Sequence, residues 1–369
     1  MADTASKQRL FSWQATFLIA LSLLLTGGLT ACPSGGGSSS ETVAGDYITV
    51  HFTAPHPAGE VPPPDGGIDT SLVALIDGAE SSVDLAAYDL DLESVVAALI
   101  RAQEAAVEVR VVVDGESAGQ AAVTQLRQAR IPLVARPAGG WGIMHNKFVV
   151  VDGTWVWTGS WNMTENGAHR NDNNAVLIAS RFLAQDYATE FEELFANQFG
   201  PTSPADTPYP MIEIEAAGED LARIEVYFAP EDEAADGILA TLAEAESTIR
   251  FLAFVFTSQP IAEALIERAA HGVAVTGVLE ARSAQNRYSQ YERLTGAGIE
   301  VLLDANPYIM HHKVFIIDEE TVILGSYNFS ASAEEENDEN LLILHDPRVA
   351  ATFLTEFERI YGEARNSDG

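Results

Sequence analysis

The sequence predicts an α/β fold made of two homologous mixed-sheet α/β/α domains related by pseudo-two-fold symmetry. One observation is that short apolar runs rich in β-branched residues alternate with helical segments along the chain. The other is an internal repeat, because the chain aligns with itself without a gap at a spacing of 166 residues, which superimposes Val83 on Ile249 and Phe191 on Phe357. A chain of 369 residues, 47% of them hydrophobic, has room for two such domains.

The N-terminus has the pattern of an export signal. Lys7 and Arg9 precede the apolar run Phe17–Leu25, which is shorter than a membrane span needs. The tetrapeptide Leu29-Thr30-Ala31-Cys32 resembles the bacterial lipobox, whose cysteine is acylated, and Cys32 is the only cysteine of the chain. We therefore expect a lipoprotein signal peptide over residues 1–31, lipidation of Cys32 and attachment to a membrane of the bacterial cell envelope. The alternative is an ordinary cleaved signal with an incidental cysteine.

Composition marks the joints between the remaining parts. The Gly- and Ser-rich stretch after Cys32 predicts a flexible linker over 32–46. The first domain is expected over 47–200 and the second over 211–369, joined by a Pro- and Thr-rich linker at 201–210.

Each domain is expected to contain matching helices and buried strands. The helical segments are Leu92–Gln103 in the first domain and Pro260–Ala270 in the second. The strands of the first domain are Lys147–Val151, Val156–Thr158 and Val176–Ile178, and those of the second are Val314–Ile317, Val322–Leu324 and Leu341–Leu344.

Both halves carry the same polar signature at the start of one of these strands. It consists of a histidine, a lysine two residues later, an aspartate five residues after the lysine, and then a Gly-Ser-x-Asn tetrapeptide. The members are His145, Lys147, Asp152, Ser160 and Asn162 in the first half, and His311, Lys313, Asp318, Ser326 and Asn328 in the second. Side chains two apart on a strand share a face, so the histidine and lysine point the same way. The serine hydroxyl and asparagine amide supply further hydrogen-bond donors suited to phosphate oxygens.

Lysine usage supports a functional site. Beyond the signal segment the only lysines of the chain are Lys147 and Lys313, each two residues after a histidine, while every other basic side chain is arginine. The pattern indicates that the site needs a compact ammonium charge. His312 falls on the opposite face of its strand, so we expect neither a role in the site nor a metal site there, and no metal or other cofactor is expected elsewhere.

These stretches resemble the phospholipase D superfamily, whose mark is H-x-K-x4-D followed by G-S-x-N, and the resemblance covers roughly residues 47–365. It implies one metal-free active site between the two halves of a monomer with an internal pseudo-dimer. One histidine would form a covalent phosphohistidine and the other would protonate the leaving alcohol. The residues carried over are His145, Lys147, Asn162, His311, Lys313 and Asn328, with Ser160 and Ser326 as further phosphate-binding groups.

The acidic residues are expected to have supporting roles. Asp152 and Asp318 end the strands and are assigned to local structure. Members of the superfamily commonly have an acid after the motif that orients the histidine; the second half has Glu339 there, whereas the first has Asn173. If each acid serves the histidine of its own half, His145 stays neutral more easily and is the nucleophile, with His311 as the acid. The acid reaching across the interface is the alternative.

Four functions fit these motifs: a phospholipase D-type hydrolase, an exported metal-independent endonuclease, a phosphatidyltransferase and a catalytically inert binding module. The formal net charge of −34, from 54 acidic and 20 basic residues, disfavours a nucleic-acid substrate. Together with the lipid anchor, this favours a phospholipid substrate. Aromatic side chains that would line an acyl-chain site, or belong to the core, are Trp141, Trp155, Trp157, Trp161, Tyr308 and Phe329.

Overall fold

The computed structural model describes residues 39–43, 46–53, 55, 67–140, 142–216 and 221–367. The predicted signal peptide, Cys32 and Trp141 lie outside these residues. Gly37–Gly369 form one compact unit, so the two homologous halves are packed together. Within the described residues, no helix combines the length and the apolar character needed to cross a membrane.

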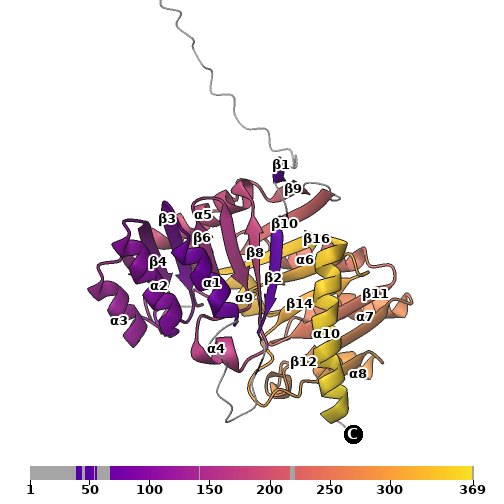
Figure 1. The fold of residues 1–369 in the computed structure, drawn as a ribbon. Coiled ribbons are helices and arrows are strands. Elements are labelled where there is room, and N and C mark those ends of the chain that lie inside the picture. The colour runs from indigo at the N-terminus through magenta and orange to yellow at the C-terminus, as the bar shows by residue number, and fades with distance from the viewer. Residues whose placement is uncertain are drawn as a thin grey trace, which may run out of the picture. The chain divides into compact units, whose positions relative to one another are not determined.

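The elements of the two halves correspond one to one (Figure 1). In the first half they are β2 (Ile48–Phe52), α1 (Ile68–Asp77), β3 (Ser82–Ala87), α2 (Glu93–Glu104), β4 (Glu108–Val113), α3 (Ala121–Gln128), β5 (Leu133–Ala135), β6 (Lys147–Val151), β7 (Trp155–Gly159), α4 (Glu165–His169), β8 (Asn174–Ala179) and α5 (Arg181–Phe195). In the second half they are β10 (Leu221–Ala229), α6 (Ala234–Ala243), β11 (Thr248–Ala253), α7 (Gln259–Ala270), β12 (Ala274–Leu279), α8 (Tyr291–Gly296), β13 (Glu300–Leu303), β14 (Lys313–Ile317), β15 (Thr321–Gly325), α9 (Ala331–Glu335), β16 (Glu339–His345) and α10 (Pro347–Ser367). The additional elements are β1 (Ser39–Val43), η1 (Gly200–Thr202), β9 (Met211–Ala216) and η2 (Ser283–Gln285).

Each half builds its own mixed sheet. The first sheet has the order β2-β8-β7-β6-β3-β4-β5, and the second repeats it as β10-β16-β15-β14-β11-β12-β13, extended at one edge by β9 and β1. In both, three strands run parallel at one end, and the other pairings within the repeated order are antiparallel; the added β1–β9 pair is parallel. The predicted fold class is confirmed, and each strand placed by the sequence repeat lies in the corresponding position of its sheet.

β1 differs from the expectation for its region. Ser39–Val43 belong to the stretch predicted as a flexible linker, yet they pair in parallel with β9 from Ser39 opposite Ile212 to Val43 opposite Ala216. An edge strand such as β9 offers unpaired N–H and C=O groups to any neighbouring chain. In addition, Glu41 accepts a hydrogen bond from the Ser180 hydroxyl of the first half. Pairing of this kind depends on a partner edge that composition alone does not reveal.

The two sheets share one core. It contains α5 side chains such as Tyr187, α10 side chains such as Phe353, and strand side chains from both sheets, including Phe148 and Val314. The other face of the first sheet is covered by α1, α2 and α3, and that of the second by α6, α7 and α8. Both faces of each sheet are therefore buried, which is why the central strands read as continuous apolar runs. The shared core also fixes the two polar signatures relative to each other.

Candidate active site

The two motif histidines are held by backbone pairing between the halves. His145 and His311 lie two residues before the start of β6 and β14. The His145 N–H donates to the Asp338 carbonyl at 2.9 Å, and the His311 N–H donates to the Asp172 carbonyl at 2.8 Å. Each histidine is thus fixed by a residue of the opposite half. The structure brings the two signatures together at one interface.

His145 is oriented by a carboxylate of the second half. Its Nδ1 lies 2.7 Å from Glu339 Oε2, and the ring is only 5% exposed. The same carboxylate accepts hydrogen bonds from the Ser326 hydroxyl at 2.6 Å and the Asn337 amide at 3.1 Å. With the Nδ1 proton directed to Glu339, His145 presents Nε2 as the free reactive nitrogen.

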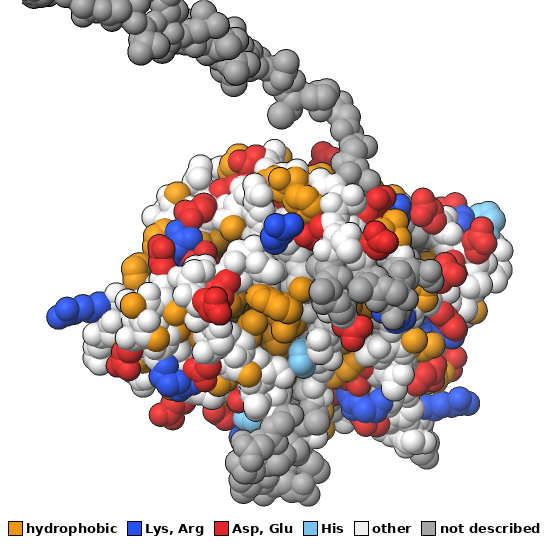
Figure 2. All heavy atoms as spheres, turned by 45° about the horizontal axis from the view of Figure 1, so that its top comes forward, with side chains coloured by type: hydrophobic (Ala, Val, Ile, Leu, Met, Phe, Trp, Pro, Cys, Tyr) orange, Lys and Arg blue, Asp and Glu red, His pale blue; other side chains and the backbone are white. Residues whose placement is uncertain are grey.

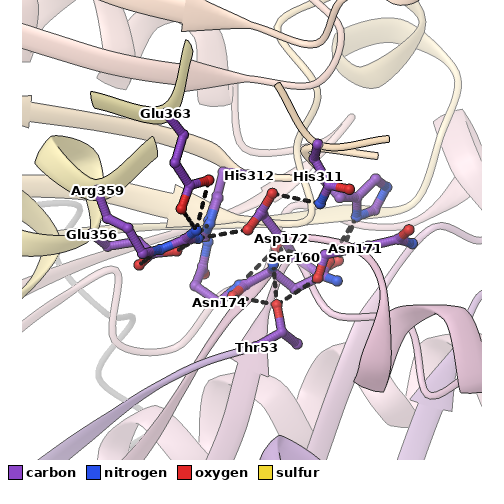
Figure 3. A network of polar contacts seen from close by, with 12 residues as sticks. Thr53, Ser160, Asn171, Asp172, Asn174, His311, His312, Glu356, Arg359 and Glu363 are labelled. Carbon is purple, nitrogen blue, oxygen red and sulfur yellow. Dashed lines mark hydrogen bonds and ion pairs between the residues drawn. The ribbon is translucent and has the colours of Figure 1, made fainter. Parts of the chain in front are cut away.

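His311 is oriented by neutral oxygens of the first half (Figure 3). Its Nδ1 lies 3.0 Å from the Ser160 carbonyl and 3.0 Å from Asn173 Oδ1. The Ser160 hydroxyl in turn donates to Asn173 Oδ1 at 3.3 Å. This arrangement repeats the one around His145, with Asn173 where the opposite half has Glu339. His311 therefore has the same tautomer but no carboxylate.

The acid serves the histidine across the interface. From the sequence, His145 is the nucleophile if Glu339 serves His311 of its own half. That assumption is wrong. The Asp338 carbonyl pairs with the His145 N–H, so the start of β16, which carries Glu339, faces the first half. The carboxylate is therefore a partner of His145, and the roles of the two histidines need a different argument.

Both lysines lie buried beside their histidines. Lys147 Nζ donates to the His145 carbonyl at 2.5 Å, and Lys313 Nζ donates to the His311 carbonyl at 2.9 Å. Lys313 Nζ also lies 3.2 Å from His311 Nε2. Each lysine side chain is 1% exposed. Two ammonium groups and two imidazoles thus lie together in one site. Glu339 is the carboxylate of this site, and it is bonded to the imidazole of His145.

Burial makes these groups reluctant to carry charge. It lowers the pKa of His145 to about 4, an effect that Glu339 opposes and the lysines reinforce. It lowers the pKa of Lys147 to about 7, although Glu339 opposes this shift. The pKa values of His311 and Lys313 are also lowered well below their usual range, first by burial and then by neighbouring positive charge. A bound anion would reverse these shifts, so the site favours a negatively charged ligand such as a phosphodiester.

The Gly-Ser-x-Asn turns complete the polar lining. Asn162 and Asn328 are half-buried, and within the described residues their Oδ1 atoms have no hydrogen-bond partner. Gly159 has a φ of +151°, and a Cβ there would lie 2.5 Å from the Asn174 carbonyl oxygen; Gly325 has the same φ and an even closer neighbour. Only glycine lets the serine turn pack this tightly against the next strand. Ser160 and Ser326 then reach the groups behind the histidines.

The two motif aspartates bind backbone away from the histidines. Asp152 accepts hydrogen bonds from the N–H groups of Glu80, Ser81 and Ser82 at 2.7–2.9 Å. Asp318 forms the same contacts with Glu246, Ser247 and Thr248 at 2.7–2.8 Å. These hydrogen bonds tie the ends of β6 and β14 to the starts of β3 and β11. Their contacts are those of local structure, as the sequence suggested.

His312 lies on the opposite face of β14, as strand alternation requires. It is fully buried, with Nδ1 2.8 Å from the Asn174 amide nitrogen and Nε2 3.4 Å from Glu356. Asn146 is its counterpart and bonds Asn340 and Glu190 at 2.7 and 2.8 Å. Both residues belong to the interface between the halves rather than to the site.

The aromatic residues considered for an acyl-chain site do not form one surface. Trp157, Trp161 and Phe329 are at most 1% exposed and belong to the outer cores of the two halves. Trp155 is exposed, and Tyr308 is half-buried beneath the Arg170 guanidinium. Core packing explains the three buried ones; Trp157 lies on β7, and Trp161 and Phe329 follow β7 and β15.

Two aromatic rings beside the histidines were not singled out from the sequence. The Tyr88 ring lies 5.0 Å from the His145 ring and 5.2 Å from Lys147 Nζ. The Phe254 ring lies 4.6 Å from the His311 ring and 4.9 Å from Lys313 Nζ. The signal was available, since the repeat superimposes Tyr88 on Phe254 directly after β3 and β11. These rings limit the positions that the two imidazoles can take. They also make the two sides differ in a second way, because Tyr88 is a phenol and Phe254 has a phenyl ring.

The chain is similar to proteins of one superfamily. The family model described as cardiolipin synthase, PLD-like domain, matches twice, over residues 72–195 and 238–361, which together exceed half of the chain. A phospholipase D of Rickettsia bellii is 31% identical over 182 residues, which are 49% of this chain and 86% of that protein. The human mitochondrial cardiolipin hydrolase is 36% identical over 124 residues, which are 34% of this chain and 49% of that protein.

A solved structure matches most of the fold. The crystal structure of phosphatidylserine synthase from Haemophilus influenzae aligns with a TM-score of 0.60 over 85% of each chain, at 13% identity. At that identity the likeness concerns the fold alone. Together with the two matches of the family model, which coincide with the two structural halves, it identifies the chain as a member of the phospholipase D superfamily and a phosphodiesterase of that group.

Proposed function

We propose that the chain is a phospholipase D-type enzyme that hydrolyses phospholipid head groups through a phosphohistidine intermediate. We further propose that acylation of Cys32 holds it at a membrane of the bacterial cell envelope. The observation that carries the mechanism is the meeting of two buried His–Lys pairs from opposite halves, with a carboxylate behind one histidine only. The similarity to a phospholipase D and to a cardiolipin hydrolase supports the substrate class.

In the first step, neutral His145 attacks the phosphorus through Nε2. The new N–P bond replaces the bond to the head-group oxygen, which takes a proton from Nε2 of cationic His311. Lys147, Lys313 and the asparagine amides stabilise the charge on the nonbridging oxygens. In the second step, neutral His311 takes a proton from water, whose oxygen attacks phosphorus as the N–P bond breaks. Phosphatidic acid leaves, and both histidines return to their starting protonation states.

The assignment of His145 as nucleophile is supported by the different partners of the two histidines. A phosphorylated imidazole that keeps its Nδ1 proton is cationic, and Glu339 at 2.7 Å stabilises that charge for the lifetime of the intermediate. His311 has only the neutral oxygens of Ser160 and Asn173 at Nδ1. Its cationic form is therefore less stabilised, so it is the stronger acid toward the leaving oxygen.

Charge favours a phospholipid over a nucleic acid. Lys147 and Lys313, the only lysines beyond the predicted signal segment, are buried in the site and do not contribute to a basic surface. On the face shown in Figure 2, basic side chains lie singly among acidic ones rather than in a continuous track. A polyanion that needs several phosphate contacts would meet repulsion over most of such a surface.

The proposal is tested with the chain that begins after Cys32, which keeps β1. Phosphatidylcholine vesicles and single- and double-stranded DNA are incubated separately with this protein and with its His311→Ala variant. We expect choline release by the unsubstituted protein alone and no DNA cleavage. Cleavage of DNA without choline release would instead assign an endonuclease. Choline release in buffer without an added alcohol shows hydrolysis, whereas a transferase would release choline only when an acceptor such as ethanol is supplied.

A further inference from the structure

A cluster of two buried carboxylates and one half-buried carboxylate lies behind the His145 side of the interface. Glu190 and Glu193 belong to α5, and Glu231 follows β10. One carboxylate oxygen of each lies within 4.8 Å of those of the other two. Glu190 is 3% exposed and Glu193 is 8% exposed. Three carboxylates held together in this way repel one another unless protons or a cation intervene.

The opposite half contains a matched site with its own cation. There, the Arg359 guanidinium lies 2.6 Å from Asp172 and 2.6 Å from Glu356, and it also binds Glu363 at 3.0 Å (Figure 3). The network therefore contains a cation of the protein itself among its carboxylates. It packs directly behind the backbone pairing of Asp172 with His311.

The repeat superimposes this network on the acidic cluster. Asp338 takes the place of Asp172, and Glu190 takes the place of Glu356, each bonded to the residue that follows the motif histidine. Glu193 takes the place of Arg359. The carboxylates are thus retained, while the cation between them is replaced by another carboxylate. Arg136 contributes positive charge at one side, with Nε 3.9 Å from Asp338.

A polar atom of the cluster lacks a partner. Within the described residues Glu193 Oε2 is buried and forms no hydrogen bond, although its side chain is more than nine-tenths buried. Burial and the neighbouring Asp206 raise the pKa of Glu193 to about 9, and burial raises the pKa of Glu231 to about 7. An ionised carboxylate in this position needs a cation close by.

We propose that Glu190, Glu193 and Glu231 bind a Ca²⁺ ion, which occupies the position that the Arg359 guanidinium has in the other half. Calcium binds oxygens at about 2.3–2.6 Å, so ligands on opposite sides of the ion lie about 5 Å apart. All three ligands are carboxylate oxygens, which Ca²⁺ prefers, and their separations, all below 4.8 Å, allow one ion to bind them together. The ion touches none of the reacting groups. It stabilises the interface behind Asp338 and His145.

The test measures thermal unfolding of EDTA-treated full-length protein at pH 7.5 with and without 1 mM CaCl₂. We expect Ca²⁺ to raise the Tm by roughly 4 °C and to bind once per chain in calorimetry. Glu193→Arg supplies the guanidinium of the other half, so this variant should gain Tm without Ca²⁺ and lose the response to it. The exposed Glu104→Gln, which removes the same charge elsewhere, should respond as the unsubstituted protein does.

Two results would overturn the proposal. One is an unchanged Tm with Ca²⁺ in the unsubstituted protein, which would mean that the cluster holds protons instead. The other is a full Ca²⁺ response in Glu193→Arg or, if that variant does not fold, in Glu193→Gln. EDTA should leave the initial rate on a chromogenic phosphodiester at 25 °C unchanged, which separates this site from the catalytic groups.

Discussion

Each half places an equivalent serine behind the histidine of the opposite half. The residue that accepts the hydrogen bond of this serine differs between the two halves. On the His145 side Ser326 donates to Glu339, whereas on the His311 side Ser160 donates to Asn173. The backbone pairing is the same on both sides, and each lysine donates to the carbonyl of its own histidine. A nearly symmetric scaffold therefore carries two chemically different histidines.

A duplicated fold can in this way divide the two roles of an acid–base reaction between its two copies. The fold supplies two imidazoles at equivalent positions, each with its Nδ1 occupied. One imidazole has a carboxylate as its partner and the other has an amide. The two imidazoles therefore differ in how strongly their positively charged form is stabilised. The experiments below test whether this one difference assigns the two roles.

The largest effect is expected from removing either imidazole. His145→Ala and His311→Ala should each lower kcat for a phosphodiester with a poor leaving group by about 10⁴-fold or more, because each step needs both groups. His271→Ala is the control, since His271 is exposed and bonds the Glu267 carbonyl. Steady-state rates of purified proteins measure the effect. Substantial activity in either motif variant would exclude the two-histidine mechanism.

Replacing Glu339 or Asn173, the side chains that bond Nδ1 of the two histidines, should show whether these partners assign the catalytic roles. Glu339→Gln removes the carboxylate from His145 and should lower kcat by about 10²–10⁴-fold. Asn173→Glu gives His311 a carboxylate, which should hold its proton more tightly and lower kcat by about tenfold. The alkaline limb of the pH–rate profile, where His311 loses its proton, should also move to higher pH in this variant. Equal losses in both variants would mean that the difference between the two sides has no catalytic role.

The sequence was sufficient for the repeat, the strands and both polar signatures, because these depend on local periodicity and on spacing. It was not sufficient for the partner of Glu339, since the spacing of the turn is the same whether it faces its own half or the other. The pairing of β1 with β9 and the acidic cluster of Glu190, Glu193 and Glu231 also escaped prediction. In each case, the contact joins segments far apart in the chain, and nothing in either segment specifies the other.

Both buried lysines, Lys147 and Lys313, should make the free energy of unfolding rise with pH. Unfolding restores the usual lysine pKa, so the unfolded chain binds a proton that folded Lys147 releases above about pH 7. The lysine therefore destabilises the fold less as pH rises toward 10. Lys147→Met should be more stable than the unsubstituted protein at pH 7.5, and the advantage should shrink by about 1.4 kcal/mol per pH unit.

Denaturant titrations between pH 7.5 and 9.5 measure this trend, with Lys313→Met as the matched variant. Its lysine also has a lowered pKa because of burial, so its advantage should shrink over the same range. A constant difference from the unsubstituted protein would show that the lysines keep their protons throughout.

The smallest effect on catalysis is expected from the motif aspartates. Asp152→Asn and Asp318→Asn weaken charge-assisted hydrogen bonds to three backbone N–H groups, so each should lower the free energy of unfolding by about 1–3 kcal/mol. Because neither side chain reaches a histidine, kcat at 25 °C should change less than about twofold. A loss of kcat without a loss of stability, in either half, would assign the aspartate to the reaction.

The most direct test of the central claim is to trap the covalent intermediate. The His311→Ala variant is mixed with bis(p-nitrophenyl) phosphate, whose leaving group departs without an acid, and the protein is then analysed by mass spectrometry. We predict one equivalent of released nitrophenolate per chain and a p-nitrophenylphosphoryl group on His145, which keeps the second aryl ester, with neither in His145→Ala. A p-nitrophenylphosphoryl group on His311 in His145→Ala, and none on His145 in His311→Ala, would contradict the assignment.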